Sequence, residues 1–330
     1  MGTDVGLDRF DSYQVKKYRH NDKLPGSISS DILTCIYEDK QKKLWFGTYD
    51  GLNLFDPSGD NFKVFRNNSL DDSSLNSNCI TGIVEDKKGN LWVVTDGSCL
   101  NRWDPEMRKF IRFPFESRKH GLSVRPSRMA AIDSKGYIWV GSISPGIIRF
   151  DPETGLFTRF EDKTADQGQF SYKSLYIDKD DKIWIATDGL GFFSYDPLNN
   201  KFKHFSLNAK GEGTNLNFIL DIIPEDDRFL LLAVDQGGIN RFDKKTGMFD
   251  YIMYNEAYED GLNNNGIWCF HKDREGILWI GTSGGGINYF NPQKELLLPS
   301  HVESVSIELL GVRQYADFVV VNLVKGSICE

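Results

Sequence analysis

Few stretches of this sequence combine residue types and spacing that could do chemistry. The segment 281–285 reads Gly-Thr-Ser-Gly-Gly and matches the Gly-x-Ser-x-Gly pattern around the nucleophilic serine of α/β-hydrolases. That serine needs a sharp turn between a strand and a helix, and no helical periodicity follows here. Without a helix N-terminus, the glycines at 284–286 also make a poor phosphate site. We therefore interpret the segment as a hairpin turn and predict no catalytic residue.

Metal and disulfide chemistry are also poorly supported. The acidic runs at 178–181 and 225–227 lack the alternating oxygen ligands, glycine and distant glutamate of a calcium loop. The histidines show no ligand spacing. The five cysteines are scattered and odd in number, so we expect no disulfide framework, and Cys35 and Cys269, at the same repeat position, are expected to be buried free thiols. We predict no metal and no cofactor.

The composition excludes further classes of function. The chain has 330 residues and a formal net charge of -8, which argues against a basic nucleic-acid-binding surface. With 40% hydrophobic residues it can bury a large core. No apolar run reaches the roughly 18 residues of a membrane span, so we predict no membrane insertion by this segment. The N-terminus does not have the basic and then apolar pattern of a signal sequence.

Any binding residues must therefore be positioned by a repeated scaffold. A tryptophan preceded by leucine or isoleucine recurs with spacings of 47, 47, 45, 47 and 48 residues, counting Leu231 as a substituted copy. The anchors are Trp45, Trp92, Trp139, Trp184, Leu231 and Trp279. Periods of about 20–50 residues are typical of solenoids, propellers and other arrays.

Each repeat has the same order around its anchor. An acid lies six positions earlier, at Asp39, Asp86, Asp133, Asp178, Glu225 and Asp273. Glycine often lies three positions earlier, and this combination predicts a tight turn whose carboxylate accepts hydrogen bonds from nearby amides. After the anchor come a glycine-containing turn, an aromatic residue followed by Asp or Asn, and a short alternating stretch. These short runs bounded by turn residues indicate strands.

Four short strands per repeat indicate a propeller blade, with strands A to D from the axis outward. We predict an all-β fold, a single seven-bladed β-propeller of four-stranded antiparallel blades over residues 1–330. Six full repeats span 28–298. Residues 1–27 provide a lead-in and a closing strand.

The seventh blade is expected to come from both ends of the chain. Residues 13–18 resemble a strand D, residues 305–312 a strand A, and residues 318–328 align with strands B and C of the fifth repeat. Pairing of the N-terminal closing strand with these C-terminal strands would close the ring and remove open edges. The alternative is that residues 299–330, the degenerate seventh blade, are instead a linker or the start of another domain.

Residues 36–56 and 273–282 resemble the two-component regulator propeller repeat, whose pattern is acid-x-x-Gly-x-Leu-Trp-Ile-Gly-Thr followed by Gly-Leu-x-x-Phe-Asp. The resemblance extends over residues 28–292. The sequence departs from the pattern at Lys42 and Asp181, which replace the turn glycine, and at Leu231, which replaces the tryptophan.

This resemblance implies a setting and a role. Such repeats occur in periplasmic sensor regions of hybrid two-component histidine kinases of Bacteroides type, where paired propellers precede an immunoglobulin-like domain, a membrane span and the kinase. The resemblance therefore implies a non-catalytic, periplasmic sensor or scaffold propeller that contributes to oligosaccharide sensing. Its expected partners are an oligosaccharide and a neighbouring propeller, an immunoglobulin-like domain or a second protomer. Any kinase activity would lie outside these 330 residues.

The best place for a ligand is where the repeat varies, because loops on a rigid scaffold commonly carry binding residues. The connections from strand D to the next strand A are long and dissimilar. Positions 14 and 11 before the anchor should lie at the channel mouth and supply cations, amides and aromatic rings. The ligand-binding candidates are Arg125, Arg128, Lys173, Asn217, Asn265 and Trp268. The basic stretch 108–128 could contact a glycan, contact another domain or protomer, or be a solvated loop.

Two other functions remain open from the sequence. A propeller lyase would need a histidine and an acid clustered at the channel mouth with a metal, and the aligned mouth positions contain no histidine. A purely structural interaction propeller would bind no oligosaccharide. Activity screens and calorimetry with acidic and neutral oligosaccharides distinguish these readings.

Overall fold

A computed structural model of the chain describes residues 2–3, 6–10, 14–96, 99–115, 126–142, 146–162, 171–205, 213–257, 261–291 and 303–305. The chain divides into two compact units. We call Thr3–Leu7 with Tyr18–Asp181 the N-terminal unit, and Met1–Gly2, Asp8–Lys17 and Lys182–Glu330 the C-terminal unit. Each unit is described separately below.

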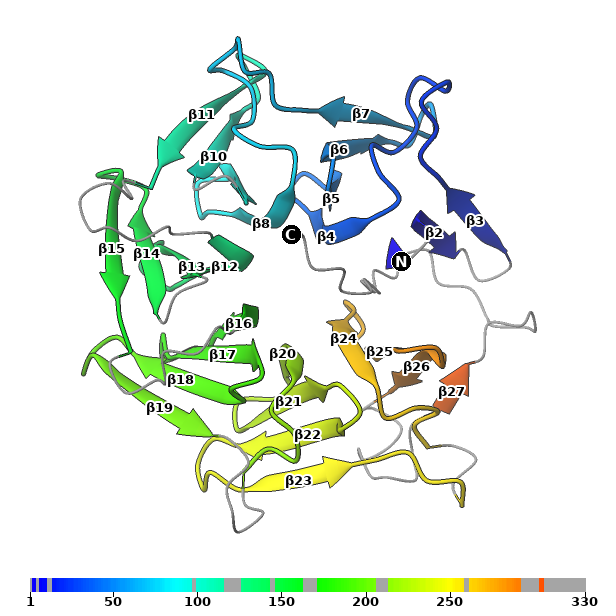
Figure 1. Cartoon of the computed structure of the whole chain (residues 1–330), viewed down its shortest axis with the longest axis vertical. Helices are drawn as coiled ribbons and strands as arrows, with labels where there is room; N and C mark the ends of the chain where they lie inside the picture. Colours follow the sequence, from blue (N-terminus) through cyan, green and yellow to red (C-terminus); the bar gives the residue numbers. More distant parts are fainter. Residues whose placement is uncertain are drawn as a thin grey trace. The chain divides into compact units, whose positions relative to one another are not determined.

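Six four-stranded sheets follow one another along the chain, and within each sheet the strands pair in sequence order (Figure 1). These are the blades of a propeller. Their strands are β4 (Leu33–Glu38), β5 (Leu44–Thr48), β6 (Gly51–Asp56) and β7 (Asn61–Phe65); β8 (Ile80–Glu85), β9 (Leu91–Thr95), β10 (Cys99–Asp104) and β11 (Lys109–Pro114); β12 (Pro126–Ile132), β13 (Ile138–Ser142), β14 (Ile147–Asp151) and β15 (Leu156–Phe160); β16 (Ser171–Ile177), β17 (Ile183–Asp188), β18 (Phe192–Asp196) and β19 (Lys201–Phe205); β20 (Ile219–Pro224), β21 (Phe229–Val234), β22 (Gly238–Asp243) and β23 (Phe249–Ile252); β24 (Ile267–Lys272), β25 (Leu278–Thr282), β26 (Gly286–Phe290) and β27 (Glu303–Val305).

The prediction of four-stranded antiparallel propeller blades is confirmed, but the number of seven is wrong, because the described residues form six such blades. Val305 was expected to begin a seventh blade. Instead, β27 pairs with β26 and completes the sixth blade as its outer strand, so the sixth repeat extends beyond residue 298. The long connection before β27 hides this strand in the sequence, because the closing strand of the other repeats follows strand C directly.

The N-terminal residues form a smaller sheet of their own. The closing strand expected at 13–18 exists as β3 (Val15–Tyr18), but it belongs to a three-stranded sheet of order β1-β2-β3 with β1 (Gly2–Thr3) and β2 (Gly6–Phe10). The local hairpin partner β2 was not predicted. The proposed C-terminal partners at 318–328 lie outside the described residues, and so does most of the expected seventh blade at 299–330.

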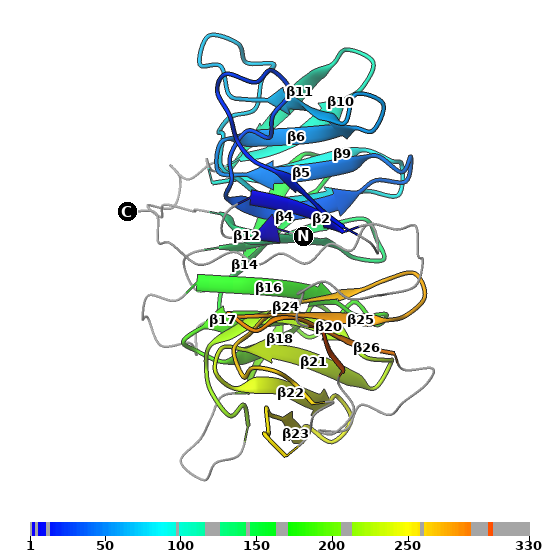
Figure 2. The same cartoon turned by 90° about the vertical axis from the view of Figure 1, so that its right-hand side faces the viewer.

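Burial differs systematically between the strands of a blade. All residues of β5 and β9 are buried, whereas β7, β15 and β19 at the outer side alternate or are largely exposed. A strand with both faces buried needs a continuous apolar run, and a strand with one wet face does not. Figure 2 shows this layering edge-on for the fifth blade, in which β20, β21, β22 and β23 lie in succession.

The acid six residues before each anchor has two structural roles. In four blades one carboxylate oxygen accepts two backbone amides of the turn, as predicted, and the other accepts the indole N–H of the anchor tryptophan. The four Nε1–Oδ2 distances are 2.8–2.9 Å, for Trp45–Asp39, Trp92–Asp86, Trp139–Asp133 and Trp279–Asp273. We call this bond the Asp–Trp lock. It ties the turn between strands A and B to the blade core.

The anchor also joins neighbouring blades. Trp45 contacts Trp103 of the following blade at 6.2 Å between ring centroids, and Trp92 contacts Phe150 at 5.2 Å. In the C-terminal unit, Trp184 contacts Phe242 at 5.6 Å. The two aromatic signals of the repeat, the anchor and the aromatic residue before Asp, therefore meet across blade interfaces. Such ring pairs add about 0.5–1.5 kcal/mol to the burial of apolar surface.

Candidate functional site

The residue 14 positions before the anchor ties three of the connections to the preceding sheet. The side-chain oxygens of Asp31, Asn78 and Asn265 accept the backbone amide two residues after the preceding outer strand, at 2.6–2.7 Å. The main-chain carbonyls of Asn78 and Asn265 accept the amides of Gly51 and Gly238 at 2.8 Å. The small amide or carboxylate side chain at this position therefore has a structural use.

A second asparagine holds three connections from within the blade. Asn53, Asn101 and Asn240 are fully buried on strand C. Their side-chain oxygens accept the amides of Ser29, Asn76 and Asn215, and their Nδ2 groups donate back to the side chains of the same residues. The connections that lead into the first and second blades are thus fixed on both sides. This pair was not predicted from the sequence, although an asparagine recurs three residues before the Asp in three repeats and before Asn291 in the sixth.

The residue 11 positions before the anchor lies at a β-bulge. The pairing of strand A with strand B shifts between Leu33 and Cys35, Ile80 and Gly82, Ile219 and Asp221, and Ile267 and Cys269. The residue in the middle is Thr34, Thr81, Leu220 or Trp268. A bulge leaves one residue without a direct cross-strand partner and redirects its side chain, and bulges are frequent beside binding sites.

The structure places the six candidate residues differently. Arg125 lies outside the described residues. Arg128 lies in β12, whose pairing with β13 is also irregular, and only the backbone of Arg128 is described. Lys173 is half-buried in β16. Asn217 precedes β20, and its carbonyl accepts the amides of Gly189 and Gly191 at 3.0 Å. The side chain of Asn265 accepts the amide of Tyr254, as described above, and Trp268 lies at the bulge of β24. Their binding of a ligand stays a prediction.

Inner strands bring some of these positions together within each unit. In the N-terminal unit β4, β8, β12 and β16 lie side by side in that order, so Thr34, Thr81, Arg128 and Lys173 occupy successive strands (Figure 1). In the C-terminal unit β20 and β24 are neighbours and carry Leu220 and Trp268. The residues 11 positions before the anchor thus have hydroxyl or cationic side chains in the N-terminal unit and apolar or aromatic side chains in the C-terminal unit.

The basic stretch 108–128 contains one cation with a clear structural task. The Arg112 guanidinium donates to the carbonyls of Asp71, Ser74 and Leu75 and to the side chains of Asp72 and Ser74, at 2.9–3.1 Å. It therefore holds the connection between the first two blades. Residues 116–125 of this stretch are not described, so its contact with a glycan or another domain stays a prediction.

The stretches that suggested chemistry serve the fold. The segment 281–285 forms the turn between β25 and β26, as predicted, and the amide of Ser283 donates to the carbonyl of Gly266 at 2.7 Å. Neither Cys35 nor Cys269 forms a disulfide within the described residues; Cys269 is buried, as expected, Cys35 is half-buried, and desolvation raises the pKa of the Cys35 thiol to about 12. Within the described ranges, no group of three or more His, Cys, Asp or Glu side chains could hold a metal ion.

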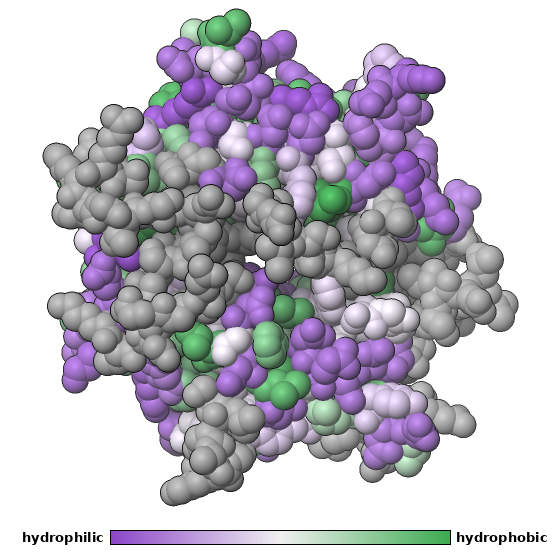
Figure 3. All heavy atoms as spheres, viewed as in Figure 1, coloured by the Kyte–Doolittle hydropathy of each residue, from purple (hydrophilic) through white to green (hydrophobic). Residues whose placement is uncertain are grey.

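Two bulge residues have a buried polar atom that lacks a hydrogen-bond partner within the described part of the chain, Thr81 Oγ1 and Trp268 Nε1. In the sixth blade, Asn263 Oδ1 and both side-chain atoms of Asn288 are also unpartnered, although the equivalent pair Asn215–Asn240 is closed. On the face seen in Figure 3, the described hydrophobic residues form only small separate groups.

The sequence pattern and the blade geometry agree with one family. The sequence model of the family described as two component regulator propeller matches residues 26–50, 74–97, 167–189 and 261–284. Four segments of the chain thus match the two component regulator propeller repeat. Each matched segment extends from the connection through the inner strand to the anchor strand. The matched segments therefore include the positions 14 and 11 residues before the anchor.

Solved structures share this fold. The extracellular domain of a protein described as the putative hybrid two component system BT3049 from B. thetaiotaomicron aligns with 24% identity and a TM-score of 0.73, over 87% of this chain and 37% of that chain. PorZ, a surface component of the type-IX secretion system of Porphyromonas gingivalis, aligns with 15% identity and a TM-score of 0.57, over 78% and 38% of the two chains. The chain therefore spans less than two fifths of either of these proteins.

None of the curated proteins matches this chain. Its described residues include no helix with the length and apolar character needed to cross a membrane.

Proposed function

We propose that this chain is a non-catalytic, extracytoplasmic sensor and scaffold propeller of a hybrid two-component system. It contributes to oligosaccharide sensing and to signal transmission toward a histidine kinase elsewhere in the system. The observation that carries the proposal is the match of the regulator propeller repeats, which extends over the connections and inner strands of four blades. The fold shared with an extracellular domain described as part of a hybrid two component system supports it.

The geometry of the blade ends suits recognition. The connections are fixed by the buried asparagines and by the residues 14 positions before the anchor, so a ligand would meet preorganised groups and lose less conformational entropy on binding. The bulge positions vary in residue type, whereas the flanking Leu33, Ile80, Ile219 and Ile267 are all fully buried. A constant frame with variable residues is what a recognition module requires.

The absence of chemistry in the proposal rests on how the reactive groups are used. The turn carboxylates of Asp39, Asp86, Asp133 and Asp273 are engaged by tryptophan N–H groups, and Ser283 lies in a hairpin. A bound ligand transmits a signal only if it binds two states of the assembly with different affinity. The partner in that equilibrium would be a neighbouring propeller, an immunoglobulin-like domain or a second protomer.

Calorimetric titration of the purified chain with oligosaccharides tests the sensing function. The panel contains neutral hexasaccharides of glucose, xylose and mannose and acidic oligosaccharides of galacturonate. We expect saturable heat with at least one of them. If none produces heat, the oligosaccharide-sensing function is wrong and the chain serves as a structural interaction propeller.

A further inference from the structure

One tryptophan is not used by the propeller architecture. The chain has seven tryptophans, and six of them pack against other aromatic rings in the described structure: Trp45, Trp92, Trp103, Trp139, Trp184 and Trp279. Trp268 has neither a ring contact nor a hydrogen bond within the described residues. The Asp–Trp lock also holds Trp45, Trp92, Trp139 and Trp279. Trp268 therefore differs from the other tryptophans of the chain.

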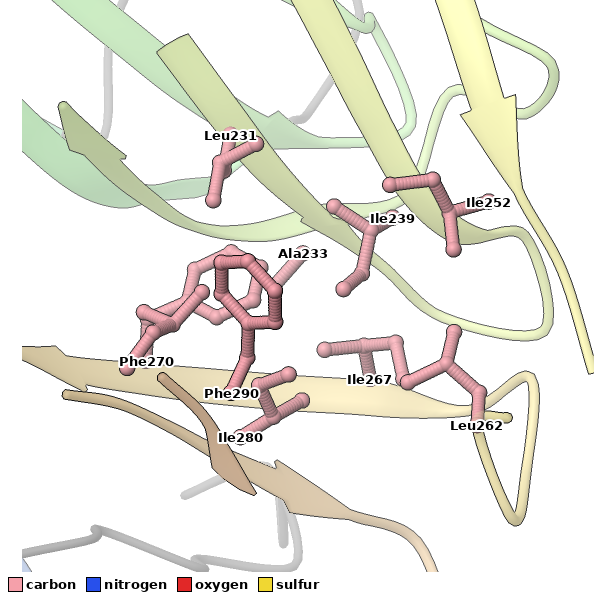
Figure 4. Close-up of a cluster of buried hydrophobic side chains, with 10 residues drawn as sticks. Leu231, Ala233, Ile239, Ile252, Leu262, Ile267, Phe270, Ile280 and Phe290 are labelled. Atoms are coloured by element: carbon pink, nitrogen blue, oxygen red, sulfur yellow. The ribbon is translucent and has the colours of Figure 1, made fainter. Parts of the chain in front are cut away.

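The repeat does not require an aromatic ring at this position. The equivalent residues are Thr34, Thr81, Arg128, Lys173 and Leu220, which share neither size nor polarity. The structural task belongs to the preceding residue, because Ile267 is fully buried in the cluster between the fifth and sixth blades, seen in Figure 4. A partly exposed tryptophan beside that cluster adds no contact that the other blades need.

The backbone around Trp268 is rigid. Ile267 pairs with Thr282 and Cys269 pairs with Gly281, so both residues beside the bulge are held by β25. The Asp221 carboxylate on the neighbouring inner strand accepts the amide of Phe270 at 2.9 Å, which joins β20 to β24 two residues further on. The indole is therefore presented from a fixed frame, as a binding side chain needs to be.

The indole nitrogen of Trp268 is buried without an acceptor in the described structure. Such a donor costs about 1–3 kcal/mol relative to a bonded one, so native proteins rarely keep it without a reason. Three more unpartnered atoms, of Asn263 and Asn288, lie in the same blade and its leading connection, where the sister blades close the equivalent pair. The sixth blade therefore lacks hydrogen bonds that the equivalent asparagines of the second and fifth blades form.

We propose that Trp268 is a ligand-contact residue, and that the exposed part of its ring stacks on the apolar face of a neutral pyranose. This inference rests on the proposed function and specifies the ligand class and the contact. A neutral sugar is favoured over an acidic one because a carboxylate lies nearby. Asp221, on the adjacent strand β20, accepts the amide of Phe270, which is two residues from Trp268 in β24. Exposed Phe218, 52% accessible at the start of β20, extends the apolar surface of the neighbouring strand.

Indole N–H signals in ¹H–¹⁵N correlation spectra of the whole chain test the contact. Trp268→Phe assigns the Trp268 signal, and maltohexaose, xylohexaose and mannohexaose are titrated in turn. A binding hexasaccharide should shift the Trp268 signal and leave the four locked indoles unchanged. By calorimetry, Trp268→Phe should weaken binding about two- to tenfold, and Trp268→Ala at least about tenfold.

Trp103→Phe is the matched control, because Trp103 packs on Trp45, Phe65 and Phe110 in the N-terminal unit. It should leave the affinity unchanged, and circular dichroism checks that all three variants fold. If an oligosaccharide binds but the Trp268 signal and both variants behave like wild type, the contact is overturned while the sensing function stands. If no oligosaccharide of the wider neutral and acidic panel binds, both proposals fail.

Discussion

The fifth and sixth blades solve the same structural problem with different residues. In the sixth blade, Asp273 accepts the amides of Glu275 and Ile277 with one oxygen and the Trp279 indole with the other. In the fifth blade, Glu225 and Leu231 stand at these two positions. The anchor there has no N–H to donate, so the Asp–Trp lock is lost.

Ion pairs take over in the fifth blade. The Glu225 carboxylate accepts the Arg241 guanidinium at 2.6 Å, and Asp243 accepts Arg228 at 2.5 Å. Both guanidinium groups lie over the ring of Phe229, at 3.5 and 4.8 Å from its centroid. In the second and third blades the residue equivalent to Arg241 instead lies over the anchor tryptophan, at 5.8 Å for Arg102 and 5.9 Å for Arg149.

Leu231 keeps the other function of the anchor. It belongs to the buried cluster that joins the fifth blade to Phe270, Ile280 and Phe290 of the sixth (Figure 4). The comparison teaches that the anchor fills the interface with the next blade whether it is tryptophan, as at Trp45, Trp92 and Trp184, or Leu231, whereas its hydrogen bond to the turn is replaceable. The predictions below test this division, beginning with the largest expected effect.

Replacing Trp92, an anchor with the Asp–Trp lock, should lower the free energy of unfolding more than replacing Leu231, the anchor without it. Trp92→Ala deletes a fully buried ring and leaves the Asp86 carboxylate without its indole donor, so we expect a loss of about 4–6 kcal/mol in the free energy of unfolding. Leu231→Ala should cost about 2–4 kcal/mol. Urea unfolding followed by fluorescence and circular dichroism measures both. An equal or greater loss in Leu231→Ala would contradict the division.

The lock itself should be worth more than the ion pair that replaces it. In Asp273→Asn, one oxygen can still accept the turn amides, but an amide group then faces the indole N–H, so we expect a loss of about 1–3 kcal/mol. In Glu225→Gln, a partly exposed ion pair is lost, with an expected cost of at most about 1 kcal/mol. Urea midpoints at pH 7 compare the two, and a costlier Glu225→Gln would reverse the ranking.

Acid should lower the free energy of unfolding, because the turn carboxylate of Asp86 has a lowered pKa in the folded chain. Burial on its own would raise the pKa of Asp86, but hydrogen bonds from Trp92 and Asn90 outweigh it and lower the pKa below its usual 3.8. A carboxyl whose pKa is lower in the folded state contributes stability above pH 3.8, and this contribution disappears as the pH falls through the folded-state value. Urea midpoints from pH 6 to pH 2 should therefore fall below about pH 4, and less steeply in Asp86→Asn. Parallel curves would show that the lock does not set this pKa.

The smallest effects concern the turn before the anchor. Gly276 has a φ of 83°, and a Cβ there would meet no atom within 4 Å, so Gly276→Ala isolates the cost of the left-handed backbone, about 1–2 kcal/mol. Lys42 holds the same place in the first blade with a φ of 66°, and Lys42→Gly should stabilise the chain by at most about 1 kcal/mol. Thermal melting measures both. If Lys42→Gly destabilises, the exposed Lys42–Glu38 ion pair outweighs the strain.

The sequence alone determined the repeat, the blade type and the turn chemistry of this protein. These are local properties: a carboxylate caps amides two and four residues away, and glycine or a tolerated substitute takes the positive φ, as at Gly89, Gly136 and Lys42. The strands also follow from short apolar runs with two buried faces, so their number per repeat could be counted. The residue types at the variable positions 11 and 14 before the anchor could be read in the same way.

Only the tertiary structure decided which repeated residues meet. Trp45 reaches Trp103, and Asn53 holds Ser29, because packing and hydrogen bonding join residues that are distant in the chain, and a periodic pattern does not specify such pairings. The blade number was wrong for the same reason: whether Val305 ends one sheet or begins another depends on which strand offers a free edge, and β26 did. The bulge that sets Trp268 apart from the buried Ile267 is likewise a property of strand pairing, which the sequence of β24 does not display.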